Sequence, residues 1–144
     1  MPRNKIGLPA TFSFSCKIPI RITDLNYGGH VGNDTVLTLI HEARMQFLGQ
    51  WGLTELQFAG VGMIMSDVAI EFKNELFYGD SVMAWVKAGE VSKIGFELFY
   101  KLEKVSGDKK ILVAAARTGM ICYDYDKKKI VSIPEVARKK LIGS

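Results

Sequence analysis

The sequence predicts an α+β protein in which one long helix packs against a five-stranded antiparallel sheet. A single helical stripe of apolar residues covers about residues 34–51, and strand-like alternation occurs once before it and four times after it. A sheet with one helix against one face is a stable layer arrangement. At 144 residues the chain has the length of one domain, so residues 1–144 are expected to form a single domain.

The predicted helix follows a polar, glycine-rich turn. A rotation of ~100° per residue gathers its apolar residues on one broad face and leaves His41 and Glu42 on either flank of the opposite face. The apolar face consists of Val36, Leu39, Ile40, Ala43, Phe47 and Trp51. Asn33 or Asp34 is expected to cap the first turn, and Gly52 marks the far end.

The strands are expected at residues 11–18, 63–75, 81–91, 94–105 and 110–125. In the first of these, alternation places Phe12 and Phe14 on one face, and Pro19 implies an edge, a bulge or a break. The connection after the helix is expected to include a short helical turn at Thr54–Phe58. The residues from Pro134 onward are expected to form a basic tail with a helical turn.

Composition excludes several classes of protein. The 48% hydrophobic content suits a compact globular chain, and the longest apolar runs fall far short of the ~18 residues of a membrane span. The first residues lack the apolar core of a signal peptide, which predicts a cytoplasmic protein. Cys16 and Cys122 are therefore expected to be buried free thiols. The net charge of +4 is modest, and no stripe of basic and aromatic residues favours nucleic acid.

Four motifs resemble one known family. They are the turn Asp24-Leu25-Asn26-Tyr27-Gly28-Gly29-His30-Val31-Gly32-Asn33, then Glu42-Ala43-Arg44, Gly79-Asp80 and Ile133-Pro134-Glu135. Together they resemble the hotdog-fold thioesterase superfamily, specifically its 4-hydroxybenzoyl-CoA and acyl-CoA thioesterase branch. The resemblance runs from about Phe12 to Glu135. One position departs from the family pattern, because Asn26 stands where the family often carries a catalytic aspartate.

The resemblance implies a hotdog fold, in which the five-stranded sheet wraps around the central helix. It implies hydrolysis of an acyl-CoA or acyl-carrier-protein thioester, with no bound cofactor and no metal. It also implies a homodimer or homotetramer, with the active site between subunits and the interface beside the Asn26–His30 turn. Met83, Trp85 and Phe99 are expected on the open face of the sheet, where apolar side chains favour a further subunit contact.

Thioester hydrolysis needs donors to the developing oxyanion, a means to activate water, and a groove for the acyl group. Backbone N–H groups of Gly28, Gly29 and Val31 lie near a helix N-terminus and are expected to bind the substrate carbonyl. His30 can donate a hydrogen bond or transfer a proton near neutral pH. The helix and the later strands would line the acyl groove.

The base is expected on the helix. Glu42 matches the family's helix glutamate and is the first candidate for general base or nucleophile, with Asp34 as the second. Asn26 can orient water or the substrate carbonyl but cannot accept a proton. Eight residues separate Asp34 from Glu42, which is ~12 Å along the axis, so the two cannot act as one compact pair within a subunit.

Three other interpretations compete with hydrolysis. Asn26 makes a non-hydrolytic binder of acyl thioesters the main alternative. A hydratase or dehydratase is disfavoured, because relatives of that kind place their His and Asp differently. A metal site built from His30, Asp34 and His41 lacks any recognised ligand motif.

Overall fold

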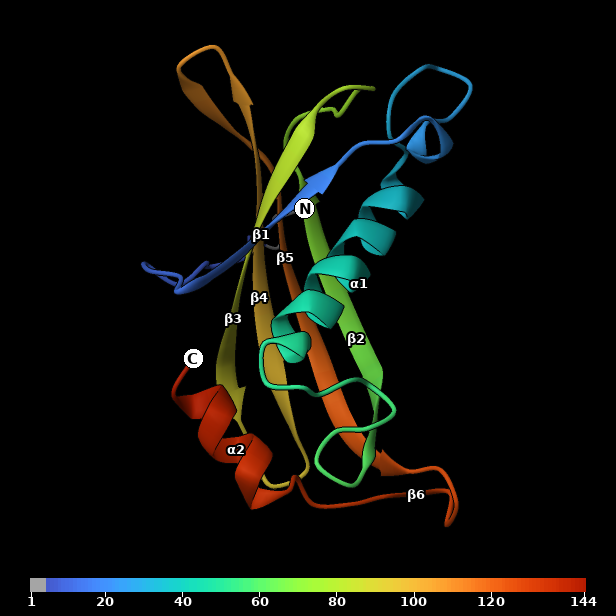
Figure 1. Ribbon diagram of the computed structural model, residues 1–144, viewed down its shortest axis with the longest axis vertical. Helices are drawn as coiled ribbons and strands as arrows, with labels where there is room; N and C mark the ends of the chain where they lie inside the picture. The colour runs from blue at the N-terminus through green and yellow to red at the C-terminus, as the bar shows by residue number, and fades with distance from the viewer. Residues whose placement is uncertain (1–4) are drawn as a thin grey trace.

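The computed structural model describes residues 5–144, and its main feature is an antiparallel sheet with α1 lying across one face (Figure 1). The elements are β1 (Phe14–Pro19), a 3-10 turn (Ile22–Asp24), α1 (Asn33–Gly49), β2 (Gly62–Phe72), β3 (Ser81–Val91), β4 (Gly95–Ser106), β5 (Lys109–Asp124), β6 (Lys129–Ile130) and α2 (Glu135–Ile142). The order across the sheet is β1-β3-β4-β5-β2, and the two-residue β6 pairs with β5. Five long strands and a central helix confirm the predicted α+β hotdog fold.

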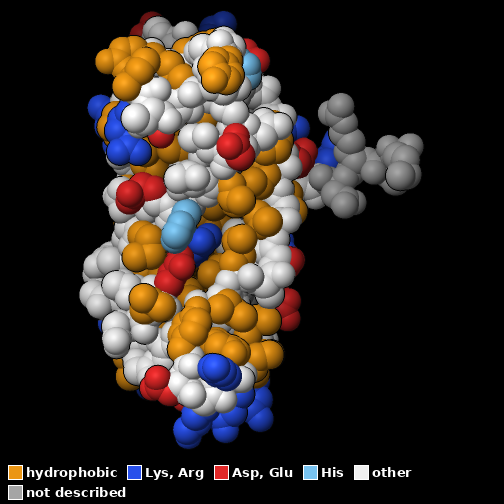
Figure 2. All heavy atoms as spheres, turned by 90° about the vertical axis from the view of Figure 1, so that its right-hand side faces the viewer, with side chains coloured by type: hydrophobic (Ala, Val, Ile, Leu, Met, Phe, Trp, Pro, Cys, Tyr) orange, Lys and Arg blue, Asp and Glu red, His pale blue; other side chains and the backbone are white. Residues whose placement is uncertain are grey.

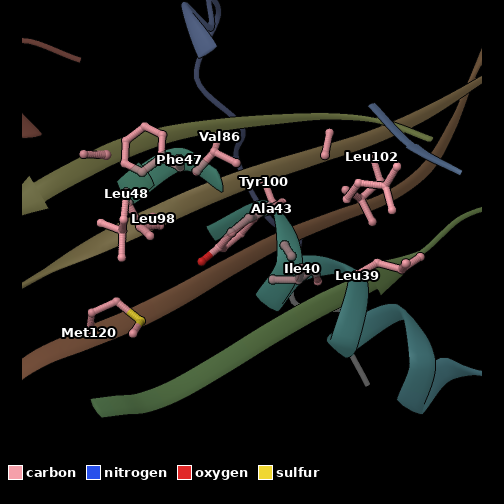
Figure 3. Close-up of a cluster of buried hydrophobic side chains, with 14 of the residues drawn as sticks. Leu39, Ile40, Ala43, Phe47, Leu48, Val86, Leu98, Tyr100, Leu102 and Met120 are labelled. Carbon is pink, nitrogen blue, oxygen red and sulfur yellow. The ribbon is translucent and has the colours of Figure 1, made fainter. Parts of the chain in front are cut away.

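The predicted apolar stripe of α1 forms the centre of the core. Its buried residues are Val36, Leu39, Ile40, Ala43, Arg44, Phe47 and Leu48. Figure 3 shows Val86 of β3, Tyr100 of β4 and Met120 of β5 around five of these side chains, which are Leu39, Ile40, Ala43, Phe47 and Leu48. Each large aliphatic or aromatic side chain buried in this way contributes about 1.5–3 kcal/mol. Arg44 is the one charged residue among these buried residues of α1.

The start of α1 differs from the expectation. Gly32 is the N-cap residue, and no side chain forms a cap hydrogen bond, so the predicted capping by Asn33 or Asp34 is wrong. Asn33 is already the first helical residue. Asp34 lies within the first turn, where a carboxylate interacts favourably with the positive end of the helix. Gly52, with φ of +70°, follows the helix end as predicted.

The inner face of the sheet alternates as the sequence indicates. Tyr100 of β4 is paired with Val86 of β3 on one side and with Ala116 of β5 on the other, and all three are buried. Ala114 and Ala116 of β5 are buried on the same face.

The first strand begins later than expected. β1 starts at Phe14 and lies at the sheet edge, and it ends at Pro19, which satisfies the expectation of an edge or a break. Phe14 packs on Phe47 of α1, whereas Phe12 packs on Trp85 and lies outside β1. The predicted common face of Phe12 and Phe14 is therefore wrong, because strand alternation does not extend to residue 12.

The two connecting segments also differ from expectation. Residues 54–58 form no helical turn; instead the Thr54 hydroxyl accepts the Gln57 N–H at 2.9 Å, a local bond that competes with helix formation. The basic tail forms a complete short helix, α2, which buries Ala137 and Leu141. Among residues 5–144, no helix is long and apolar enough to cross a membrane.

Candidate active site

The glycine-rich turn forms a tight loop that is fastened to the segment following β2. The Asn26 N–H donates to the His30 carbonyl at 2.9 Å, and Gly29 adopts a φ of +77°, which glycine tolerates best. The Val31 N–H donates to the Leu76 carbonyl at 2.9 Å. His30 forms a β-bridge with Phe77, so the turn lies at the C-terminal end of β2.

Asn26 and Asp34 border the same small space. The Gly28 N–H donates to Oδ1 of Asn26 at 2.9 Å, which fixes the amide and leaves Nδ2 as its free donor. A Cβ atom on Gly32 would lie 2.7 Å from Oδ1 of Asp34 and 3.6 Å from Nδ2 of Asn26. The absence of a side chain at Gly32 therefore lets a hydrogen-bond donor and a carboxylate approach each other at the head of α1.

The His30 ring lies beside Gly28, where an added Cβ atom would be 3.2 Å from the ring and 3.3 Å from Oδ1 of Asn26. The His30 side chain is half-buried, and Nδ1 lies 3.3 Å from the Val31 carbonyl oxygen. It borders a hollow between the start of α1 and the segment after β2, lined also by Phe72, Leu76 and Val113.

The backbone donors expected from the sequence are already engaged within the chain. The Gly28 N–H donates to the Asn26 side chain, the Gly29 N–H to the Asn26 carbonyl, and the Val31 N–H to Leu76. These three groups fix the shape of the turn. Nδ2 of Asn26 and the N–H groups of the first turn of α1 are better placed to receive a ligand oxygen.

Glu42 is separated from Asn26 and His30, although it shares a hollow with Asp24, the first residue of the turn. This separate hollow of about 230 Å³ lies between β1 and α1 and is also lined by Lys17, Arg21 and Leu39. Oε2 of Glu42 accepts a hydrogen bond from Gln46 at 3.0 Å. Of the two candidate carboxylates, the structure thus brings Asp34, and not Glu42, next to Asn26 within one subunit.

The sequence analysis did not predict a polar cluster that forms around His41 and Arg44 of α1. Nε of Arg44 donates to Oε1 of Glu55 at 2.8 Å, and Nε2 of His41 lies 3.1 Å from the same oxygen. Arg44 also donates to the Tyr100 hydroxyl at 3.2 Å, and that hydroxyl lies 2.7 Å from Oγ1 of Thr118. The available signal was a charged residue, Arg44, within the apolar stripe.

The buried members of this cluster depend on one another electrostatically. Burial by itself lowers the pKa of Arg44, but the contacts with Tyr100 and Glu55 outweigh it and raise the pKa above its usual value. Burial raises the pKa of the Tyr100 phenol, and Arg44 opposes that shift. Arg44 therefore remains a cation inside the core and holds Glu55 in place.

An apolar strip runs along the inner face of β2 beside α1. Met65, Val68 and Phe72 are each more than a third exposed, and their partners on β5 are Met120, Thr118 and Ala114. Those partners belong to the inner layer, so the strip is the part of this layer that α1 leaves uncovered. Figure 2 looks onto the side of the molecule where β2 lies, and hydrophobic side chains gather along it.

The fold and the turn at the head of α1 define a hotdog protein with a polar site opening beside an apolar strip. A family model described as the thioesterase-like superfamily matches residues 20–141, and the chain belongs to this superfamily. The thioester hydrolase class expected from the sequence is confirmed at this level. Among residues 5–144, no group of three or more His, Cys, Asp or Glu side chains is arranged to hold a metal ion.

Named relatives act on aromatic acyl-CoA thioesters. A 1,4-dihydroxy-2-naphthoyl-CoA hydrolase from Microcystis aeruginosa is 28% identical over 119 residues, which are 81% of this chain and 83% of that protein. A 1,4-dihydroxy-2-naphthoyl-CoA thioesterase from Synechocystis superposes with a TM-score of 0.79 at 18% identity, over 90% of this chain and 95% of that one. An Asp-to-Asn variant of 4-hydroxybenzoyl-CoA thioesterase, solved with 4-hydroxybenzoyl-CoA, superposes with a TM-score of 0.81 at 15% identity. The superposition covers 89% of this chain and 97% of that one.

Proposed function

We propose that the protein hydrolyses acyl-CoA thioesters to the free acid and coenzyme A, and that aromatic acyl groups are its preferred class. One observation carries this proposal: Gly32 lets the amide of Asn26 and the carboxylate of Asp34 border one space at the head of α1. The thioesterase-like superfamily supplies the reaction class. The aromatic substrates named for the relatives supply the acyl class.

The turn residues divide the work of thioester hydrolysis. Nδ2 of Asn26 donates to the thioester carbonyl, assisted by N–H groups of the first turn of α1, which favour the developing negative charge. His30, whose ring lies beside Gly28 and lines the adjoining hollow, orients the substrate. Asp34 accepts a proton from the attacking water, because it is the carboxylate next to Asn26.

Glu42, the base that the sequence analysis favours, is the alternative to Asp34. Its side chain faces the hollow beside β1, and β1 and β2 form opposite edges of the sheet. A thioester bound at the turn would have to reach across α1 to meet it. Separate tests of the two carboxylates are therefore needed.

A dimer formed through β2 would complete the acyl groove. β2 pairs with β5 on one side only, and its other edge is open among the described residues. Unpaired strand edges readily pair with a second strand. In the proposed dimer two copies of β2 pair antiparallel about a two-fold axis, and the strip of Met65, Val68 and Phe72 is closed by the partner.

A cytoplasmic location and acyl-carrier-protein as an alternative donor remain predictions from the sequence.

A non-hydrolytic acyl-thioester binder is the second candidate function. Asn26 favours it, because an amide at the position of an expected aspartate binds a carbonyl but accepts no proton. Such a protein would retain the turn and the apolar strip and would bind acyl-CoA without turnover.

One assay separates the two functions. Purified protein is mixed with a panel of aromatic and straight-chain acyl-CoAs, and free thiol is measured alongside acyl-CoA binding by calorimetry. Hydrolysis predicts thiol release that is proportional to protein concentration and is fastest for aromatic acyl groups. Tight binding of an acyl-CoA without thiol release would support the binder and overturn the hydrolase.

A further inference from the structure

The cluster of His41, Glu55 and Arg44, called the helix cluster here, has a graded exposure. The Arg44 side chain is 6% exposed, Glu55 24% and His41 55%. Oε1 of Glu55 contacts both of the other side chains: it lies 2.8 Å from Nε of Arg44 and 3.1 Å from Nε2 of His41. The buried arginine thus fixes a carboxylate, and the carboxylate fixes an accessible imidazole.

The helix cluster is anchored in the core through Arg44. Arg44 donates a further bond to the buried Tyr100 hydroxyl, which lies 2.7 Å from Thr118. Burying a cation is unfavourable unless its partners are in place, and such networks hold the attached groups rigidly. Nε2 of His41 faces the Glu55 carboxylate, so a hydrogen on Nε2 can be donated to Oε1 and Nδ1 remains available to a substrate.

The loop that carries Glu55 is fastened to the start of β2, whereas the turn is fastened beyond the end of β2. The Met63 N–H, at the start of β2, donates to the Glu55 carbonyl at 2.8 Å. The turn is fastened beyond the other end, where Val31 bonds Leu76 and His30 bridges Phe77. In an antiparallel pair of β2 strands, the start of one strand lies beside the end of the other. The proposed dimer therefore brings the helix cluster of one subunit to the turn of its partner.

We propose that His41, held by Glu55 and Arg44, is the general acid that protonates the leaving sulfur of a thioester bound at the partner subunit's turn. The proposal rests on the hydrolase function and the β2-paired dimer proposed above. Figure 2 shows acidic, basic and histidine side chains together in the middle of this apolar face, so a substrate lying along the strip would meet them.

Hydrolysis requires two proton transfers, one from water and one to the leaving sulfur. Asp34 takes one proton from water while the water oxygen bonds to the thioester carbonyl carbon. The carbon–sulfur bond breaks, the sulfur leaves with the electron pair, and Nδ1 of the protonated His41 gives it a proton. The products are the acid and free thiol, and solvent exchange returns His41 and Asp34 to their starting protonation states.

The test compares two leaving groups. An acyl-CoA and an aryl thioester of the same acyl group are hydrolysed by wild type and by His41→Gln. The aryl thiolate is a weak base that leaves without a proton, so loss of a general acid affects only the acyl-CoA. We expect kcat of His41→Gln on acyl-CoA to fall by about 10²-fold, with the aryl thioester changed less than about three-fold.

Two comparison variants separate a catalytic effect from a structural one. Asp34→Asn should lose activity on both substrates, because the base is needed for either. Gln50→Ala, an exposed position at the end of α1, should lose activity on neither. Equal loss of His41→Gln on both substrates, or no loss on acyl-CoA, would overturn the proposal while leaving the hydrolase intact. A wild type inactive on every thioester overturns the proposed function and this inference with it.

Mixing of subunits tests the placement across the dimer. After exchange of equal amounts of His41→Gln and Asp34→Asn, half of the dimers are mixed, and each of these holds one intact site. Activity should then recover to about a quarter of the wild-type value if the two groups come from different subunits. Exchange without recovery, verified by mass spectrometry of the mixed dimer, would contradict a site shared between subunits.

Discussion

The carboxylate of Glu55 lies 2.8 Å from the guanidinium of Arg44 and joins the loop before β2 to the centre of α1. Removing the carboxylate leaves a buried cation without its charged partner. Glu55→Ala should therefore lower the free energy of unfolding by about 2–3 kcal/mol, somewhat less than for a fully buried pair because Glu55 is partly exposed. Urea denaturation measures the change. Glu135→Ala, which breaks an exposed pair with Arg138, is the control and should change stability by less than about 0.5 kcal/mol.

Gly32→Ala should reduce activity without disturbing the fold. The φ of Gly32 is −74°, which alanine adopts freely, but its Cβ would lie 2.7 Å from Oδ1 of Asp34. The carboxylate must turn away from Asn26, and we expect kcat to fall by about 10-fold, because misplaced catalytic groups lose rate steeply. Gly49→Ala, with open space around the new methyl group, is the matched control and should retain full activity. Unchanged kcat in Gly32→Ala would show that the position of Asp34 has no role in turnover.

Asn26→Asp tests whether the amide acts as a donor. The substitution removes the Nδ2 donor and puts two carboxylates beside Gly32, where they repel each other and the substrate oxyanion. We predict a loss in kcat/KM of about 10²-fold, similar to the removal of one oxyanion donor. Asn26→Ser keeps a short donor and should lose less. If Asn26→Asp instead gives an enzyme faster than wild type, the native amide weakens catalysis and its role as the donor is wrong.

The two free thiols, a buried Cys122 and a half-buried Cys16, predict an alkaline loss of stability. Burial raises the pKa of Cys122 from 9.0 to about 11, and burial followed by the charge of Glu42 raises that of Cys16 to about 11. A thiol whose folded pKa is the higher one stabilises the fold fully below pH 9, and this contribution disappears as the pH rises from 9 to 11. The loss for the buried Cys122 is on the order of 2 kcal/mol. Denaturation midpoints measured from about pH 8 to 11 should fall less in Cys122→Ala; parallel curves for the two proteins would contradict the assignment.

Periodicity predicted the elements well because it reports burial directly. The stripe of α1 and the alternation of β3, β4 and β5 each place apolar side chains in one core. The contacts that decided the site are non-local and leave no such pattern. Glu55 contacts Arg44 only after the loop folds back onto α1. Packing also decides which flank of α1 faces β1, and Glu42 lies on that flank, away from Asn26. The local exceptions arose where Gly32 took the N-cap position and where Thr54 bonded its own loop.

In the proposed mechanism Asp34, in the first turn of α1, is the base that activates water. This role is tested most directly by the kcat of Asp34→Asn and Glu42→Gln measured side by side on the best acyl-CoA substrate. Both substitutions preserve shape, and both residues are exposed on α1, so the fold should be intact in each. Removal of a general base costs about 10²–10⁴-fold in rate, and we predict that loss for Asp34→Asn with Glu42→Gln within about three-fold of wild type. The reverse result would return the base to Glu42 and contradict the site described at the head of α1.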